Sequence, residues 1–326
     1  MPFERLEFRT LTAQQPNGNC YVTHFDAGYA VFGLAMLRSL CRYDTRSRVL
    51  VVGMDARVRT IVAADVAIAD RVEVVEVEEL EEHFAVLRRL RGERSWREYC
   101  WTLTPFLLQY AMETGRGRTM ATYVDADLYF FASPVQLLED LRAGDRHVVL
   151  TDHDYVPSRD LRGESGRFCV QFLPVRNSEL GGSFVDWWRD LCIDSCSEVA
   201  TPEVFGDQKY LDRAPGLFGD AVRVESGEGK FLGPWNALRL RRSSSRPIAY
   251  HFHGLRSIAG RMVLRSGEWR LGAARRLYRE YEQELSKVLR DNTSLRLPRT
   301  SLTVRSCAVL LRRGLPIGLL PSGSTS

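Results

Sequence analysis

The chain has 326 residues, 44% of them hydrophobic and 26% charged, and a formal net charge of +4. This composition is typical of a folded globular protein and excludes a disordered one, and the small charge without a basic recognition helix argues against nucleic-acid binding. The sequence has no run of about 18 apolar residues and begins with the charged segment MPFERLEFRT, so it predicts a cytoplasmic protein without a membrane span or signal peptide.

The first half of the chain alternates between predicted strands and helices. A strand at Tyr21–Thr23 leads through the turn FDAGY into a helix with apolar residues at 31, 32, 34, 36, 37 and 40. The runs SRVLVVGMD and RVEVVEVEEL have the continuous apolar character of buried parallel strands. Ser95 and Glu98 have capping-box spacing before the next helix, which we expect to end near Gly115. This alternation predicts an α/β fold with a mostly parallel sheet flanked by helices.

Two aspartates follow the next predicted strand. The strand RTMATYV leads directly into Asp125 and Asp127, and ligands of parallel sheets bind at the carboxyl ends of strands. Residues i and i+2 of a strand project to the same side, so the two carboxylates either converge or flank a sharp bend. Two carboxylates at such a short distance raise each other's pKa unless a cation binds to both of them. Mg²⁺ or Mn²⁺ is the usual cation. The motif alone is equally compatible with a solvated turn capped by Asp127.

Beyond residue 145 the predicted strands are HVVLTDHDY, GRFCVQFLPVRN and PIAYHFHG, with helices in SFVDWWRDLCIDSC and FGDQKYLDRA. A helix expected within 266–292 carries one apolar stripe, so it should pack on the body of the protein or on a partner. The stripe consists of Ala274, Leu277, Tyr278, Tyr281, Leu285, Val288 and Leu289. Residues 293–326 form a basic segment that we expect to be a flexible tail, and its charge favours peripheral contact with the inner face of a membrane.

Four motifs occur in the order found in one enzyme family. They are YVTHFDAGYAVFGLAMLRSL, YVDADLYFF, GDQKYLD and HFHG. Through them the chain resembles, from about residue 20 to 256, the nucleotide-sugar glycosyltransferases of the GT-A fold, specifically family eight, which includes glycogenin and bacterial lipo-oligosaccharide galactosyltransferases. The resemblance implies a GT-A (Rossmann-like) catalytic domain with a C-terminal helical extension. The expected divisions are a catalytic domain at 1–265, with a nucleotide-binding half at about 18–145 and an acceptor-side half at 146–265, then a helix at 266–292 and the tail at 293–326.

The resemblance assigns metal ligands to the D-x-D and H-F-x-G motifs. It implies that Asp125 and Asp127 bind Mn²⁺ or Mg²⁺ and that His251 is the third ligand. His253 would lie on the same side of a regular strand and is the alternative ligand. Without the resemblance, two histidines in an apolar strand are more typical of polar core residues.

The resemblance assigns catalysis to the D-Q motif. It implies that Asp207 orients hydroxyls of the donor sugar and that Gln208 lies beside the anomeric carbon. The alternative is structural: Asp207 would then be a helix N-cap after Gly206, and Gln208 a surface amide.

Donor binding is assigned to the first loop and to several positions elsewhere. The resemblance implies that Tyr29 stacks on the base and that Asp26 accepts a hydroxyl or ring N–H, with Thr23 and Phe25 beside them. Arginines at a helix start favour a diphosphate, although they are equally typical of a solvated surface. The remaining predicted donor contacts are Arg94, Arg97, Ala126, Trp235 as a sugar platform, Asn236 as a hydrogen-bonding amide, Gly254 and Arg256.

The chain departs from the family pattern at two places. In RFCVQF, Cys169 replaces the asparagine and Gln171 the glycine of the usual F-N-x-G segment. The lysine that follows H-F-x-G in the family is not matched at Ser257, and the adjacent Arg256 could take over its phosphate contact.

The activity implied by the resemblance is metal-dependent transfer of a sugar from a nucleotide-diphosphate sugar, a UDP-sugar, to a hydroxyl acceptor. Retention of configuration and a role in bacterial glycan or glycosylated natural-product biosynthesis are implied with it. One alternative is a D-x-D phosphohydrolase, although that family has Thr or Val where this chain has Tyr129. The other is a non-catalytic nucleotide-sugar-binding protein, which predicts that the D-Q pair and the histidine lie away from the D-x-D.

Overall fold

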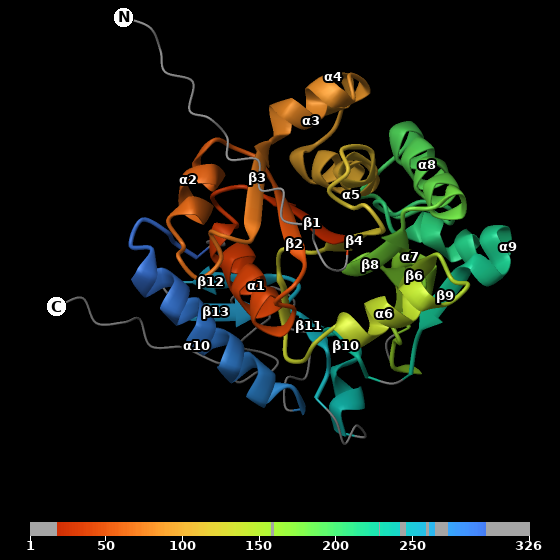
Figure 1. Ribbon diagram of the computed structural model, residues 1–326. Helices are drawn as coiled ribbons and strands as arrows, with labels where there is room; N and C mark the ends of the chain where they lie inside the picture. The colour runs from red at the N-terminus through yellow and green to blue at the C-terminus, as the bar shows by residue number, and fades with distance from the viewer. Residues whose placement is uncertain are drawn as a thin grey trace, which may run out of the picture.

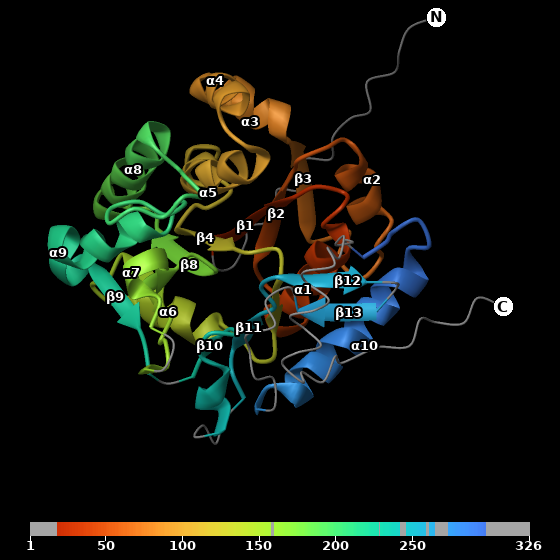
Figure 2. The same cartoon turned by 180° about the vertical axis from the view of Figure 1, so that it is seen from behind.

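A mixed sheet of eight strands forms the centre of the protein, in the order β3-β2-β1-β4-β8-β6-β7 with β9 beside β6 (Figure 1 and Figure 2). The computed structural model describes residues 18–157, 160–227, 229–241, 246–258, 261–264 and 273–297.

The amino-terminal half of the sheet is parallel, as the alternation of strands and helices predicted. β1 pairs with β2 and with β4, and β2 pairs with β3, all in parallel register. Apolar residues on both faces of these strands are buried because helices cover both faces. The bounds are Asn19–Phe25 for β1, Arg48–Gly53 for β2, Val72–Glu76 for β3 and Met120–Val124 for β4.

The second half of the sheet is mainly antiparallel, so the sheet as a whole is mixed. β8 runs antiparallel to β4 and β6, β7 runs antiparallel to β6, and only β9 runs parallel to its neighbour. The segment predicted as one strand at GRFCVQFLPVRN is interrupted by a turn at Val170 and Gln171. The bounds are Val148–Asp152 for β6, Phe168–Cys169 for β7, Phe172–Arg176 for β8 and Val222–Glu225 for β9.

The helices form two layers, one on each face of the sheet. Residues of α1, α2, α6 and α10 share one hydrophobic cluster, and residues of α3, α4, α5 and α8 share the other (Figure 1). The predicted capping box begins α5, where the Glu98 N–H donates to Ser95 Oγ at 3.3 Å. The bounds are α1 Ala30–Tyr43, α2 Arg57–Ala63, α3 Val77–His83, α4 Val86–Glu93, α5 Trp96–Glu113, α6 Val135–Ala143, α7 Arg162–Ser165, α8 Glu179–Asp194, α9 Ala214–Phe218 and α10 Arg275–Asp291.

A small sheet joins the segment after β4 to the late part of the chain. β11 lies between β10, which is parallel to it, and β5, which is antiparallel. A separate hairpin of β12 and β13 follows. The bounds are Leu128–Phe130 for β5, Phe231–Leu232 for β10, Ala249–His251 for β11, Leu255–Ile258 for β12 and Arg261–Leu264 for β13, with short 3-10 helices at Lys209–Arg213, Gly219–Ala221 and Ala237–Arg241.

Helix α10 packs on the body of the protein beside α1, so the first of the two predictions for its apolar stripe is confirmed (Figure 2). Its residues Leu277, Tyr281 and Leu285 are buried in the cluster that contains α1. Two ion pairs reinforce the contact, Arg38 with Asp291 at 2.8 Å and Arg42 with Glu284 at 3.2 Å. The predicted helix start before residue 273 and the tail from residue 298 lie outside the described residues.

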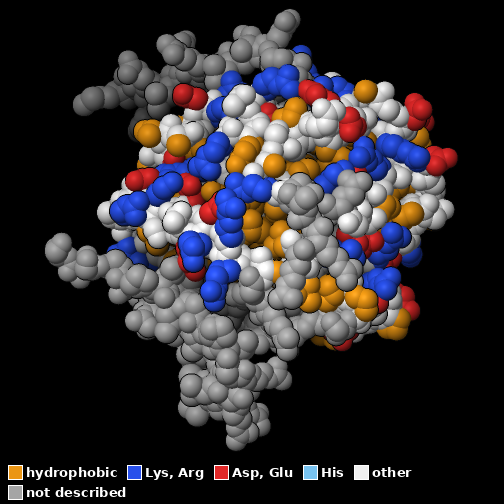
Figure 3. Space-filling model, turned by 90° about the horizontal axis from the view of Figure 1, so that it is seen from below, with side chains coloured by type: hydrophobic (Ala, Val, Ile, Leu, Met, Phe, Trp, Pro, Cys, Tyr) orange, Lys and Arg blue, Asp and Glu red, His pale blue; other side chains and the backbone are white. Residues whose placement is uncertain are grey.

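Within the described part of the chain, none of the helices combines the length and the apolar character that crossing a membrane requires. On the face seen from below, basic side chains are spread widely with acidic ones among them (Figure 3). This distribution agrees with the small net charge.

Candidate active site

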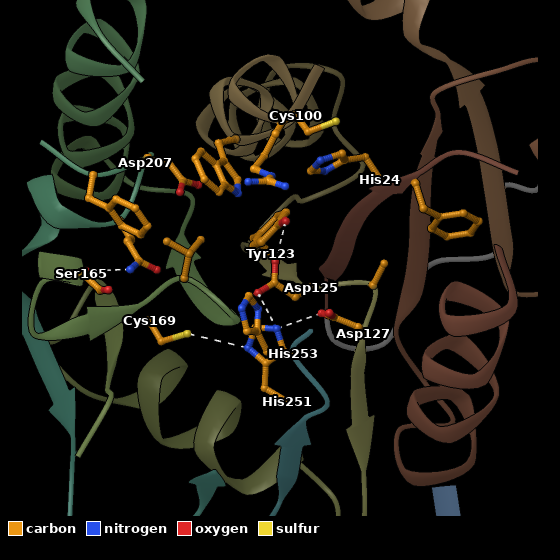
Figure 4. A pocket seen from close by; sticks show the side chains of 18 of the residues that line it. His24, Cys100, Tyr123, Asp125, Asp127, Ser165, Cys169, Asp207, His251 and His253 are labelled. Carbon is orange, nitrogen blue, oxygen red and sulfur yellow. Dashed lines mark hydrogen bonds and ion pairs between the residues drawn. The ribbon is translucent and has the colours of Figure 1, made fainter. Parts of the chain in front are cut away.

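A pocket of about 520 Å³ opens at the carboxyl ends of β1, β2 and β4 (Figure 4). Its centre contains the aspartate pair and the two late histidines, with His24 on one side and Asp207 on the other. The predicted site residues in its wall are Phe25, Asp26, Tyr29, Arg97, Asp125, Ala126, Asp127, Asp207, Gln208, Trp235, His251 and His253.

The aspartates occupy a sharp bend between β4 and β5. The Asp125 N–H donates to the Gln171 carbonyl at 3.0 Å, and the Leu128 N–H donates back to the Asp125 carbonyl at 3.1 Å. β5 then pairs with β11 so that Leu128 lies opposite His251. The Phe252 N–H also donates to the Asp127 carbonyl, at 2.9 Å. This antiparallel pairing brings a histidine more than 120 residues away in sequence to the two carboxylates.

The imidazole of His251 faces both carboxylates. Its Nε2 lies 2.8 Å from Asp127 Oδ1 and 3.6 Å from Asp125 Oδ2. The hydroxyl of Tyr29 donates to Asp127 Oδ2 at 2.6 Å, and that of Tyr123 donates to Asp125 Oδ1 at 2.9 Å. The two carboxylates therefore converge on one nitrogen while separate phenols hold their other oxygens.

Burial and mutual charge shift the pKa values of this group in opposite directions. Burial raises the pKa of Asp125, although His251 opposes the shift. Burial would also raise the pKa of Asp127, but His251, His253 and the Tyr29 hydroxyl hold that pKa well below its usual range. Burial would lower the pKa of His251, yet Asp127 keeps it well above the usual value. A protonated imidazole is thus the positive partner of the carboxylates.

The residues of this group fit a divalent cation. Asp127, His251 and His253 each offer one ligand atom, and these atoms lie within 4.8 Å of one another. Asp125 is outside that set, but its Oδ2 is close to His251 Nε2. Carboxylate oxygens suit Mg²⁺ and Mn²⁺, and imidazole nitrogen is a common metal ligand. The two carboxylates already hold the positively charged imidazole of His251, and a bound cation would neutralise the same negative charge.

The D-Q pair reaches the pocket from a loop that passes closely under α5. Gly206 has φ +57°, and a Cβ on it would lie 3.2 Å from the Trp101 ring. Asp207 is 5% exposed, and burial raises its pKa to about 7 despite a hydrogen bond from Thr104. The following 3-10 helix begins after Gln208, with no side-chain cap, so Asp207 is not its N-cap. The Gln208 amide donates to the Ser165 carbonyl at 2.6 Å.

Phe25, Asp26 and Tyr29 of the first loop line the pocket. Asp26 accepts a hydrogen bond from the Tyr29 N–H at 2.8 Å. The Tyr29 ring packs edge-to-face on Phe32 at 4.9 Å, and its hydroxyl is bonded to Asp127. Tyr29 therefore contacts Asp127 directly, a role that the sequence did not predict.

Three predicted donor contacts lie outside the pocket wall, and two of them have hydrogen-bond partners within the protein. Arg94 donates to the Thr102 hydroxyl and to the Ile193 carbonyl, and is absent from the pocket wall. Asn236 is fully buried, where it accepts from the Gly233 N–H at 2.9 Å and donates to the His153 carbonyl at 2.8 Å. Thr23 is buried in β1, also outside the wall. The hydrogen bonds of Arg94 and Asn236 therefore go to the protein itself.

The other predicted contacts differ in how far they reach the pocket. Arg97 lines it while paired with Glu198 at 2.7 Å. Trp235 lines it too, but its ring is enclosed edge-to-face by His153 and His251 at 5.0 and 5.4 Å. Gly254, which has a φ of +74°, is not among the residues that line the pocket. The side chain of Arg256 lies outside the described residues.

Several wall residues had not been predicted. His24 is the residue before the last of β1, and burial lowers its pKa to about 4. His153 follows β6, and burial lowers its pKa to about 3, so both imidazoles are neutral at pH 7. Tyr155 stacks on His153 at 4.7 Å. The signal available in the sequence was position, because His24 and His153 each stand at the carboxyl end of a predicted strand.

Comparisons with known proteins gave distant similarities. No family model matches the chain. The uncharacterized protein YfnF of Bacillus subtilis (strain 168) is 27% identical over 258 residues, which cover 74% of this chain and 83% of YfnF. The uncharacterized protein YfnD of the same organism is 29% identical over 170 residues, which cover 51% of this chain and 53% of YfnD.

Solved structures are similar at the level of the fold. The galactosyltransferase LgtC, in complex with donor and acceptor sugar analogs, superposes with a TM-score of 0.51 at 16% identity, covering 89% of this chain and 99% of LgtC. The bifunctional glycosyltransferase WbbM superposes with a TM-score of 0.50 at 13% identity, covering 73% of this chain and 46% of WbbM. The chain therefore has the GT-A glycosyltransferase fold that its motifs predicted.

Proposed function

We propose that the protein is a metal-dependent glycosyltransferase that transfers a sugar from a UDP-sugar to a hydroxyl acceptor with retention of anomeric configuration. The observation that carries the proposal is the convergence of Asp125, Asp127, His251 and Asp207 on one pocket within a GT-A fold. Similarity to two bacterial proteins supports a role in bacterial glycan or glycosylated natural-product biosynthesis.

Two groups of residues would have separate roles, one in holding the cation and one in binding the nucleotide. Asp125, Asp127 and His251 would hold Mn²⁺ or Mg²⁺, with His253 as a further ligand. The cation supplies positive charge where the diphosphate leaving group becomes more negative. Phe25 and Asp26 line the side of the pocket where base and ribose would bind.

The D-Q pair would act on the sugar. Asp207 lies on the opposite side of the aspartate pair from His24 (Figure 4), and Gln208 lines the same pocket, so the sugar would lie between the diphosphate and these two residues. Gln208 is held by the Ser165 carbonyl, and Asp207 by the indole of Trp188, which donates to its backbone carbonyl at 2.7 Å. Such fixed polar groups can stabilise charge that develops only in the transition state.

Donor specificity provides the first test. UDP-, GDP- and dTDP-sugars are screened by thermal shift with Mn²⁺ and with EDTA, and the best donor is then assayed for sugar transfer and for hydrolysis. We expect the UDP-sugars to stabilise the protein only with the metal. Full activity in EDTA, or in Asp125→Ala or Asp127→Ala protein that remains folded, would contradict the metal-dependent mechanism.

The D-Q pair provides a second test that separates catalysis from binding. Asp207→Asn and Gln208→Ala should leave UDP affinity nearly unchanged and lower kcat by orders of magnitude, because their interactions are made mainly in the transition state. Unimpaired turnover in both folded variants would favour a binding protein or another reaction centre. Release of inorganic phosphate from a phosphomonoester would instead favour a phosphohydrolase, and NMR of the product would report its anomeric configuration.

A further inference from the structure

The two carboxylates of the candidate metal site are each held at one oxygen by a tyrosine. Tyr123 donates to Asp125 Oδ1 at 2.9 Å, and Tyr29 donates to Asp127 Oδ2 at 2.6 Å. Tyr123 precedes Asp125 by two residues along β4, so both side chains leave the backbone on the same side. Tyr29 comes from the loop before α1, 98 residues from its partner. The two carboxylates thus have independent supports.

The histidine has a comparable arrangement. The Nδ1 atom of His251 faces Cys169 Sγ at 3.9 Å, within the sulfur hydrogen-bond range (Figure 4). Cys169 is 4% exposed at the end of β7, so this contact is enclosed. Sulfur is a weak hydrogen-bonding group, so the contact orients the ring more than it holds it.

The atoms that remain face one another. Nε2 of His251 lies 2.8 Å from Oδ1 of Asp127 and 3.6 Å from Oδ2 of Asp125. These are the atoms of the three side chains that the tyrosines and the cysteine leave unoccupied. Each predicted ligand therefore has one atom directed at the shared centre and another directed at a supporting residue.

We propose that Tyr29, Tyr123 and Cys169 are positioning residues that determine which atom of each ligand faces the cation. The inference rests on the proposed function, because it presupposes that the pocket binds a divalent metal. Outer partners of this kind restrict rotation of the ligand side chains, so the site needs less ordering when the ion binds. Removing a hydroxyl should therefore weaken metal binding even though the hydroxyl does not touch the ion.

Tyr281 provides a matched control. It is buried behind the same site, with its ring stacked on Phe252 at a centroid distance of 3.8 Å. Within the described part of the chain its buried hydroxyl has no hydrogen-bond partner. Tyr281→Phe therefore removes a hydroxyl from the same core without removing a bond to a ligand.

The experiment measures Mn²⁺ affinity without nucleotide or acceptor, by following the electron paramagnetic resonance signal of free Mn²⁺ in titrations of the wild type, Tyr29→Phe, Tyr123→Phe, Cys169→Ala and Tyr281→Phe. Circular dichroism and melting temperature report on the fold of each variant. We expect Tyr29→Phe and Tyr123→Phe to bind Mn²⁺ about 10–100-fold more weakly, Cys169→Ala to show a smaller loss, and Tyr281→Phe to match the wild type.

Different failures have different meanings. If folded Tyr29→Phe and Tyr123→Phe bind Mn²⁺ as tightly as the wild type, the positioning role is overturned while the metal site stands. If the two variants lose only melting temperature, their hydroxyls stabilise the fold and the proposal is likewise overturned. If the wild type itself does not bind Mn²⁺, the metal dependence in the proposed function fails, and the positioning role fails with it.

Discussion

At the scale of single residues, the two histidines of HFHG have different surroundings although they are two positions apart. His251 ends β11, is 6% exposed, and faces both carboxylates. His253 follows the strand and is exposed, with its ring 5.5 Å from that of His251. If the site binds a cation as proposed, burial and fixed orientation would make His251 the more effective ligand, since less freedom would be lost on binding.

The first prediction compares the two histidines as metal ligands. His251→Ala should weaken Mn²⁺-dependent UDP binding more than His253→Ala, because the His251 imidazole is buried against both carboxylates whereas His253 is exposed. Calorimetric titration of UDP with and without Mn²⁺ measures the difference. The reverse order would assign the main ligand role to His253.

The second prediction concerns Asp207 and pH. Burial raises the folded-state pKa of Asp207 from 3.8 to about 7. The contribution of this carboxyl to the free energy of unfolding is therefore complete below pH 3.8 and is lost as the pH rises through about 7. Asp207→Asn does not titrate. In EDTA, the free energy of unfolding of the wild type should therefore fall by about 2 kcal/mol relative to Asp207→Asn between pH 5 and pH 8.

Urea unfolding of both proteins at pH 5, 6, 7 and 8 measures this change. Asp220→Asn serves as the control variant, since that carboxyl is fully exposed and lies outside the pocket wall. Parallel pH profiles for the wild type and Asp207→Asn would contradict the raised pKa.

At the scale of elements, α10 completes the support of the site. Its Tyr281 stacks on Phe252, the residue that follows His251, and its Glu284 pairs with Arg42 of α1. The Phe252 N–H in turn donates to the Asp127 carbonyl. The C-terminal helix is therefore packed directly behind the residues that form the candidate metal site.

The third prediction tests this packing. Leu285→Ala removes a side chain that is 2% exposed and should lower the free energy of unfolding by about 2–5 kcal/mol through lost burial and a cavity. Leu180→Ala, at a side chain that is 48% exposed, should change it by less than about 0.5 kcal/mol. Equal small effects in urea unfolding would mean that α10 does not contribute to the core.

At the scale of the whole molecule, the candidate site joins the two halves of the chain. Asp125 and Asp127 belong to the first half, whereas Asp207 and His251 belong to the second. Ligands that bind across such a junction stabilise the folded chain as a unit, because they bind the native state and not the unfolded one.

The fourth prediction follows from this junction. UDP and Mn²⁺ together should raise the melting temperature more than the sum of their separate effects, with about 2.7 kcal/mol of stabilisation when the ligand is at 100 times its Kd. Asp127→Ala should abolish the extra increase while leaving any effect of UDP alone. Additive shifts in the wild type would contradict shared binding of metal and nucleotide.

The sequence by itself determined the local features of this protein. Continuous apolar runs predicted the parallel strands, the spacing of Ser95 and Glu98 predicted the start of α5, and the apolar stripe predicted that α10 packs against a surface. The position of Asp125 and Asp127 after a buried strand placed them at the pocket. These features depend on neighbouring residues in the chain, where periodicity and capping act directly.

Only the tertiary structure decided which side chains meet. Arg94 and Asn236 have side chains that could bind a ligand, but their hydrogen bonds go to the protein. The antiparallel half of the sheet depends on strand pairings that no local sequence pattern specifies. The bond between Tyr29 and Asp127 depends on the pairing of β1 with β4, and the approach of His251 to the carboxylates depends on the register of β11 against β5. A shift of that register by one residue would turn His251 to the other face of the sheet, and periodicity in either strand is the same for both registers.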